Sequence, residues 1–284
     1  MPRMPSARAF LTSTLLATLA TAGSAAADPA APAAPTSPLR FPSLAPDGAV
    51  SEVAAEVAIG IYDGADVNLY STHLSAQFVT PDRIGGYARV SAMSLDDAQA
   101  LSDLELGGLY RADFTDATLA LRAGVVLPTG PDQDSGFDEA FLPLIHLASR
   151  RPSDLAASAV DSTVVRLAAS PAVQRGVLFA RADVGLDVFI DSPGDDNPDP
   201  LYHIDLAAGF KQGAAGATIE LSSLGSLGSD ASDEGTFDAI TLGGQYDLGE
   251  ATVGGGLSIP FDTFDQGGLD LSGKTLFANV AAKL

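Results

Sequence analysis

Charged side chains recur at every second position in several stretches of this sequence. In FARADVGLDVFID, residues 179–191, charged residues alternate with apolar ones. Successive side chains of a β-strand point to opposite faces, so such charges gather on one wet face behind an apolar one. Charges arranged in this way either line a pore and set its selectivity or brace a narrow lumen as ion pairs. The candidate lumen-lining residues are Arg89, Glu105, Arg111, Asp113, Arg122, Arg181, Asp183, Asp187, Asp205 and Lys211.

Two acidic loops offer carboxylates to a cation. They contain Asp132, Asp134, Asp138 and Glu139 in the first and Asp191, Asp195, Asp196 and Asp199 in the second. Calcium binds about six to eight oxygens, and the glycine and closing glutamate of an EF-hand loop are misplaced here. We therefore expect solvated loops without a metal site. A softer alternative is that divalent ions bridge these loops to the phosphates of lipopolysaccharide.

The remaining residues with reactive side chains form no recognisable catalytic or cofactor motif. His73, His146 and His203 show no metal-ligand spacing, and the sequence contains no cysteine. Neither a G-x-S-x-G motif nor a phosphate-binding loop is present. We therefore expect no catalytic residue, no metal and no cofactor, and a protein that is not an enzyme. The formal net charge of −21 argues against nucleic acid as a partner.

The elements that must position the charges are long strands with strict alternation. The expected ranges are 53–62, 67–79, 84–94, 104–114, 117–128, 163–170, 177–190, 201–211, 215–224, 237–248, 250–261 and 275–284. Soluble β-sandwiches alternate too, but their strands cluster near five or six residues, whereas transmembrane strands need about 9–11. Lipid would cover the apolar faces of all these strands without help from a second sheet.

The connections between these strands alternate between short and long, which is typical of outer-membrane barrels. The sequence therefore predicts an all-β fold, a closed antiparallel transmembrane β-barrel of about 12 strands (10–14) with meander topology. The long connection 129–162 is the uncertain region of this count. Its apolar stretch FLPLIHLAS, residues 141–149, fits either a further strand or a short helix that lies on the mouth or plugs it.

The N-terminus predicts export. Arg3 and Arg8 precede an apolar stretch, and Ala25-Ala26-Ala27 fits a cleavage site. We expect a signal peptide at residues 1–27 and a leader rich in proline and alanine at 28–50, which acts as a spacer on the exported side. Residues 51–284 then form the barrel in the outer membrane of a Gram-negative bacterium.

One hairpin carries a family resemblance. LSDLELGGLYRADF followed by LALRAGVVLPTG resembles the central hairpin of the phenol-degradation meta-pathway family of outer-membrane barrels. The matching residues are Asp103, Leu104, Glu105, Leu106, Gly107, Tyr110 and Leu127-Pro128-Thr129-Gly130. The resemblance implies transport of an aromatic or hydrophobic compound. The last strand, TLFANVAAKL, alternates as in barrels that present their C-terminal strand to the barrel-assembly machinery, although it ends in Leu284 where an aromatic residue is usual.

These observations predict a narrow channel through which a small solute passes passively. The expected partners are outer-membrane lipid, lipopolysaccharide, the assembly machinery and the solute. Two alternatives remain open from the residues alone. One is a secreted, soluble β-sandwich that binds a ligand or a partner, and the other is a non-conducting barrel with a structural role.

Overall fold

The computed structural model describes residues 39–45, 47–62, 68–95, 98–130, 150–159, 161–192, 197–228, 236–261 and 273–284. The chain divides into two units, residues 1–37 and 38–284, and every described residue belongs to the second unit. The expected signal peptide and the stretch FLPLIHLAS therefore lie outside the described residues, as do most of the acidic loop residues. No helix of the described part is long and apolar enough to cross a membrane.

The described residues form thirteen strands and one short 3₁₀ helix. The strands are β1 (Glu52–Tyr62), β2 (Asn68–Val79), β3 (Ile84–Leu95), β4 (Ala98–Leu101), β5 (Leu104–Asp113), β6 (Ala117–Leu127), β7 (Thr163–Arg175), β8 (Leu178–Asp191), β9 (Leu201–Gln212), β10 (Ala215–Ser226), β11 (Phe237–Asp247), β12 (Ala251–Pro260) and β13 (Gly273–Lys283). The 3₁₀ helix, η2, spans Pro152–Ser158.

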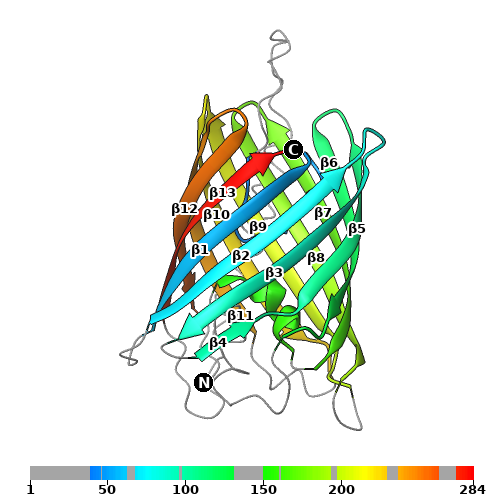
Figure 1. Cartoon of the computed structure of the whole chain (residues 1–284). Coiled ribbons are helices and arrows are strands. Elements are labelled where there is room, and N and C mark those ends of the chain that lie inside the picture. The colour runs from blue at the N-terminus through cyan, green and yellow to red at the C-terminus, as the bar shows by residue number, and fades with distance from the viewer. Residues whose placement is uncertain are drawn as a thin grey trace, which may run out of the picture. The chain divides into compact units, whose positions relative to one another are not determined.

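The strands pair antiparallel in chain order, and β1 also pairs with β13, so the sheet closes on itself (Figure 1). Twelve strands build the wall, because the four-residue β4 only extends the pairing of β3 beyond the end of β5. The predicted closed antiparallel barrel of about twelve strands in meander order is confirmed. The alternative of a two-sheet sandwich is wrong, because one continuous sheet forms the whole wall.

The alternation in the sequence locates most strands to within a few residues, and β7 is the clearest departure. The pattern predicts that this strand ends at Ser170, with the following residues in a connection, but it continues through Pro171 to Arg175. The pairing of β7 with β8 skips Ser170 and Pro171. Proline lacks the N–H that a sheet ladder needs, so a gap in the ladder at this position lets the strand continue through it.

The two ends of the barrel differ in their connections. At one end the strands join through two to four residues, at 80–83, 114–116, 176–177, 213–214 and 248–250. Gly213 adopts φ +61° in one of the two-residue turns, a conformation that favours glycine. This short-turn end, which also holds the C-terminus and the start of β1, corresponds to the periplasmic end of outer-membrane barrels. We call the opposite end the long-loop end.

The outer face of the wall is apolar, as a lipid-facing surface must be. Each of the twelve wall strands projects at least one large hydrophobic side chain outward with an exposed fraction of 38 % or more. Exposed aromatic rings gather near the strand ends, as in the aromatic girdles of such barrels. They are Phe78, Tyr110, Phe114, Phe210 and Tyr246 at the short-turn end, and Tyr70 and Phe261 at the other.

Candidate functional site

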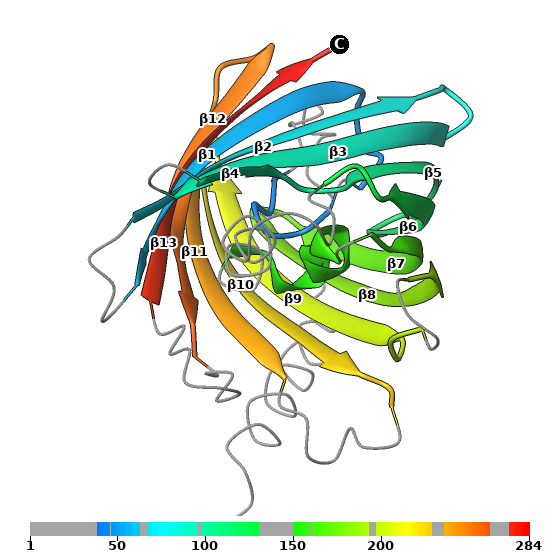
Figure 2. The ribbon, with the colours of Figure 1, turned by 60° about the horizontal axis from the view of Figure 1, so that its bottom comes forward.

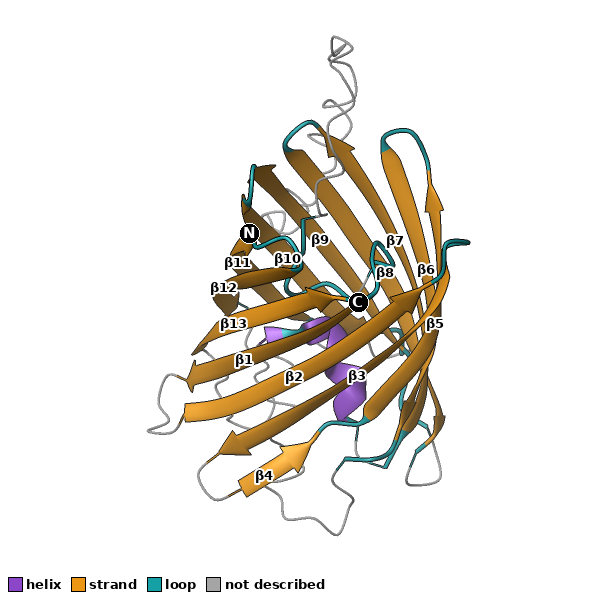
Figure 3. Ribbon diagram, turned by 45° about the horizontal axis from the view of Figure 1, so that its top comes forward, coloured by secondary structure: helices purple, strands orange, loops and turns teal. Residues whose placement is uncertain are grey.

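Two segments that belong to no wall strand lie inside the barrel (Figure 2). The first, which we call the leader insert, comprises residues 39–45 and 47–50 and joins β1 at the short-turn end. The second, the loop insert, comprises residues 150–159 with η2 and leads to β7 at the long-loop end; Figure 3 shows its helix within the ring of strands. The leader insert is part of the segment that the sequence predicts as a spacer, and in the structure it occupies the lumen.

Apolar contacts seat the leader insert against the wall. Leu39, Phe41 and Leu44 are buried with Ala207 of β9, and Phe179 of β8 packs against them. Gly209 and Gly216 leave the space for Leu39, because a Cβ atom at either position would come within 2.4 and 2.6 Å of its methyl groups. The wall is therefore shaped to receive this leucine.

Hydrogen bonds attach the same insert at several depths. At mid-lumen, the Ser43 N–H donates to Glu220 of β10 at 2.7 Å, and its hydroxyl bonds to that of Thr241 of β11 at 3.0 Å. Three further bonds join a backbone group of the insert to a wall side chain. The N–H groups of Arg40 and Gly48 donate to Gln245 at 3.0 Å and to Gln77 at 3.1 Å, and Arg181 donates to the carbonyl of Ala45 at 2.7 Å.

The loop insert combines an apolar side with a charged one. Its apolar residues Leu155, Ala156 and Ala157 pack on wall residues Met93, Val126, Val164, Phe189 and Leu224. On the charged side, Asp154 pairs with Arg89 of β3 at 2.9 Å and with Arg166 of β7 at 3.3 Å. The apolar contacts seat the helix against the wall near the long-loop end, and the ion pairs orient it.

The two inserts meet at Arg150, which is fully buried. Its guanidinium donates to both oxygens of Glu56 on β1, at 3.0 and 2.8 Å, and lies 3.8 Å from the centre of the Phe277 ring. It also donates to the hydroxyl of Ser43 at 2.7 Å, in the leader insert. One side chain of the loop insert thus holds the wall and the leader insert together.

A belt of alternating charges crosses five adjacent strands of the wall. Arg89 on β3 pairs with Glu105 on β5, which also accepts from Arg166 on β7 at 2.9 Å. Arg166 in turn binds Asp187 on β8 at 2.8 Å. Gly124 on the intervening β6 leaves room for the Tyr87 hydroxyl, which donates to Glu105 at 2.7 Å, since a Cβ there would lie 2.5 Å from that oxygen.

A second group lies closer to the short-turn end. Arg122 on β6 donates to both oxygens of Asp183 on β8, at 2.7 and 2.6 Å, across Ala168 of β7. Arg181 approaches the same carboxylate at 3.2 Å, and His203 lies 3.5 Å from it. Both hydrogen bonds of Arg122 come from its Nη2 atom, and charge-assisted bonds of this kind are stronger than bonds between neutral groups.

All ten residues predicted from the sequence lie on the inner face of the wall. Seven are buried in mid-lumen: Arg89, Glu105, Arg122, Arg181, Asp183, Asp187 and Asp205. The other three lie towards the short-turn end, where Arg111 pairs with Asp113 at 2.7 Å and Lys211 with Asp247 at 3.0 Å. Asp205 forms no ion pair among the described residues, and one of its oxygens has no hydrogen-bond partner. Their role in selectivity stays a prediction.

Sequence reasoning missed several charged residues of the lumen, six of which show why. Glu56, Arg166 and Glu220 lie on wall strands and share the alternation of the predicted ten, so the pattern could have found them. Arg150, Arg151 and Asp154 lie in the loop insert, where no periodic pattern marks a direction. Alternation shows which way a strand residue points and is silent about a loop.

The residues that carry the family resemblance have structural roles. Asp103, between β4 and β5, accepts hydrogen bonds from the backbone N–H groups of Thr129 and Gly130 at 2.9 and 2.8 Å. Leu104 N donates to the Thr129 hydroxyl at 2.8 Å. These bonds lock the β5–β6 hairpin at the long-loop end. Burial raises the pKa of Asp103 to about 6, even though the two N–H donors act in the opposite direction.

The charge of the loop insert is set by its arginine partners. Burial alone would raise the pKa of the Asp154 carboxyl, but the guanidinium groups of Arg89, Arg166 and Arg151 outweigh it. They hold the pKa of Asp154 well below its usual value. The carboxylate is therefore ionised, and its ion pairs are present, over the ordinary range of pH.

Among the described residues, one group of three side chains has the donors for a metal ion: Asp183, His203 and Asp205, with ligand atoms within 4.8 Å of one another. Asp183 is already bound by Arg122 and Arg181. Two guanidinium charges beside the group oppose a cation, so we assign no metal to it.

The barrel is similar to those of solved outer-membrane channels. The NanC porin matches with a TM-score of 0.54 at 12 % identity, over 81 % of this chain and 100 % of that chain. An outer membrane channel from Pseudomonas putida F1 matches with a TM-score of 0.54 at 12 % identity, over 88 % of this chain and 100 % of that chain. No protein-family model matches the sequence, and no curated protein does. The resemblance to the phenol-degradation meta-pathway family therefore stays a prediction.

Three observations agree on the class of protein. The wall closes without a free edge, its outer face is apolar, and short turns at one end oppose longer connections at the other. The likeness to solved channels shows the same fold. The chain is an outer-membrane β-barrel with a porin-like fold.

Proposed function

We propose that this protein is a narrow outer-membrane channel for a small polar solute, closed in the described state by its two inserts. One observation carries the proposal: the lumen is filled by segments outside the strand ladder, while the wall behind them is charged and polar. The leader insert is held by hydrogen bonds and a small apolar seat, contacts that can break without opening the barrel. Its withdrawal would leave a polar passage.

The chemistry of the wall favours a polar solute over the aromatic or hydrophobic one that the family resemblance implies. The belt from Arg89 to Asp187 and the group around Asp183 put charges along the inner face of the wall from β3 to β8. An apolar solute would displace water from these charges and offer them no hydrogen bonds in return. Such desolvation is unfavourable.

Conductance in planar bilayers tests the proposal. We expect the full chain to show rare, small openings, and a variant that lacks residues 39–50 to show larger and longer ones. Both proteins should migrate differently on gels with and without boiling, which shows that the barrel is folded. A folded deletion variant that stays silent over a wide range of voltage would overturn the proposal.

The filled lumen also favours a second candidate, a non-conducting barrel whose inserts brace the wall permanently. Arg150 and Arg166 each tie the wall to the loop insert through buried ion pairs. Removal of the leader insert distinguishes the two candidates. A structural barrel then loses stability and gains no conductance, whereas a channel gains conductance.

A further inference from the structure

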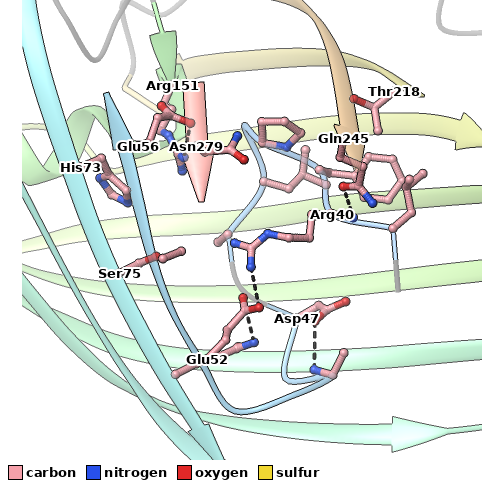
Figure 4. Close-up of a pocket in the computed structure, with 18 of the residues that line it drawn as sticks. Arg40, Asp47, Glu52, Glu56, His73, Ser75, Arg151, Thr218, Gln245 and Asn279 are labelled. Atoms are coloured by element: carbon pink, nitrogen blue, oxygen red, sulfur yellow. Dashed lines mark hydrogen bonds and ion pairs between the residues drawn. The ribbon is translucent and has the colours of Figure 1, made fainter. Parts of the chain in front are cut away.

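A cavity of about 70 Å³ lies between the leader insert and the wall (Figure 4). One buried water needs roughly 10–15 Å³ by the same measure, so this space accommodates a molecule of several non-hydrogen atoms. Arg40 and Asp47 of the leader insert, Glu52 and Glu56 of β1, and His73 of β2 line it, among others. The cavity is polar and adjoins both inserts.

The unpartnered hydrogen-bonding atoms around this cavity are donors. Arg89, Arg151 and Arg181 all line it, and each has a buried Nε without a hydrogen-bond partner among the described residues. These side chains come from β3, the loop insert and β8, and their exposed fractions are only 6, 8 and 7 %. Buried donors in proteins nearly always find an acceptor, so three such donors around one cavity point to a ligand that supplies acceptors.

The carboxylates that line the cavity already have partners. Glu56 binds Arg150 through both oxygens, and Glu52 pairs with Arg40. Asp47 accepts a hydrogen bond from Ala49 N at 2.9 Å and faces Arg111 at 3.7 Å. Some buried side-chain atoms that line the cavity have no hydrogen-bond partner. Among the described residues, all of these atoms are guanidinium nitrogens. The unused buried donors favour an anion over a cation as the occupant of this cavity.

We propose that this cavity binds a small monovalent anion, with a carboxylate of the size of formate or acetate as the ligand class. Guanidinium groups recognise carboxylates through charge-assisted hydrogen bonds. The size of the cavity excludes larger acids, and the nearby carboxylates of Glu52 and Glu56 disfavour a multiply charged anion. The site goes beyond the channel function, because it exists equally in a barrel that never conducts.

Because Arg40 of the leader insert also lines the cavity, an occupied site favours the inserted state of the leader. A ligand that binds only this state stabilises it by mass action. Acetate should therefore slow proteolysis of the leader segment in the folded barrel. Gluconate at the same ionic strength, being too large for the cavity, should have no such effect.

Binding of labelled acetate to the full chain in detergent, by equilibrium dialysis, tests the site. We expect one saturable site per chain, for which formate competes and gluconate does not. Arg151→Lys keeps the charge but removes the Nε donor, and should weaken binding at least tenfold. Arg83→Lys makes the same change outside the cavity, in an exposed pair with Asp113, and should alter binding less than twofold. Gel mobility with and without boiling verifies that both variants are folded.

A second measurement needs no variant. Crystals of the unaltered protein soaked in bromide should show an anomalous peak among Arg89, Arg151 and Arg181. The proposal is overturned if wild type binds no acetate saturably, if Arg83→Lys weakens binding as much as Arg151→Lys, or if bromide occupies only other positions.

Discussion

At the scale of single residues, the buried arginines determine the geometry of the lumen. Arg166 binds Asp187, Glu105 and Asp154 through its guanidinium, and also the carbonyl of Ser153. A buried ion pair adds little net stability compared with an apolar pair, but removal of one partner leaves uncompensated charge. A buried arginine such as Arg166 therefore fixes the positions of the carboxylates around it, and its loss is costly because those carboxylates stay buried without a partner.

Arg166→Met should destabilise the barrel strongly, because three carboxylates would lose a buried partner. We expect a loss of about 3–5 kcal/mol in the free energy of unfolding, measured by urea titration in detergent. Arg83→Met is the control, because Arg83 is half exposed in its pair with Asp113 and such pairs contribute at most about 1 kcal/mol. Equal losses for both variants would contradict the assigned role of Arg166.

Arg122 should influence ion selectivity once the lumen is open. In a barrel that lacks residues 39–50, Arg122→Gln leaves the Asp183 carboxylate less compensated, so the reversal potential should shift towards cation selectivity. The control is Arg175→Gln, which removes the same charge at the exposed end of β7. An unchanged reversal potential for Arg122→Gln would show that this arginine only braces the wall.

Moderate acid should not release the loop insert. The pKa of Asp154 lies below its ordinary value, so the stabilisation from its ion pairs is complete above that ordinary value, about 3.9, and is lost only as pH falls through the lowered pKa. The openings of the full chain in bilayers should therefore stay as rare at pH 4.5 as at pH 7. Asp154→Asn removes the charged anchor and should raise the opening frequency throughout this range. Wild-type openings that increase steeply towards pH 4.5 would contradict this assignment.

At the scale of elements, the wall could be predicted from the sequence and the inserts could not. Alternation such as that from Arg181 to Asp187 shows whether each side chain points into the lumen or towards lipid. The pattern is strict because lipid requires apolar side chains on one face. The leader insert belongs to the segment 28–50, which is rich in proline and has no period, so composition favours a spacer. Its place in the lumen depends on the seat for Leu39 at Gly209 and Gly216, which only the folded wall brings together.

A reversible covalent lock tests whether the leader insert moves. The sequence has no cysteine, and the hydroxyl oxygens of Ser43 and Thr241 lie 3.0 Å apart, so Ser43→Cys with Thr241→Cys should form a disulfide. Oxidation should abolish voltage-driven openings, and a reductant should restore them. The control pair, Thr241→Cys with Ser258→Cys, joins two wall strands whose hydroxyls lie 3.1 Å apart, and should leave openings unchanged. Openings that persist in the oxidised lock would show that this insert is not the gate.

The seat itself offers a compensation test. Gly216→Ala adds a methyl group 2.6 Å from Leu39, so it should loosen the leader insert and speed its proteolysis. Leu39→Ala makes room for that methyl group. Proteolysis of the double variant should therefore be slower than the sum of the two single effects predicts. A double-mutant cycle measures this difference. If the effects of the two substitutions simply add, Leu39 does not contact position 216.

At the scale of the whole molecule, the barrel reverses the usual arrangement of a soluble protein, with charge inside and hydrocarbon outside. Val184 and Ile204 project from the outer face with 49 and 42 % exposure, although they lie at mid-strand. In a membrane these positions contact acyl chains. Aromatic residues make up only 7 % of the sequence, but the exposed ones in the described part of the chain lie near the strand ends.

Spin labels can verify this orientation. Labels at Val184→Cys and Ile204→Cys in lipid vesicles should be accessible to oxygen and protected from a water-soluble nickel chelate. A label at Asp116→Cys, which is exposed in a short turn, should show the reverse preference. Nickel accessibility at Ile204 would mean that water, not lipid, covers the wall.

Arg150 has a consequence for communication across the outer membrane. It anchors a segment that enters from one mouth and grips a segment that enters from the other. Withdrawal of the leader insert takes the Ser43 hydroxyl and the Pro42 carbonyl from this guanidinium, and withdrawal of the loop insert takes the guanidinium from the leader insert, so each departure makes the other easier. Linkage of this kind is reciprocal, so we expect displacement of the leader insert at the short-turn end to loosen the loop insert at the long-loop end, and the converse.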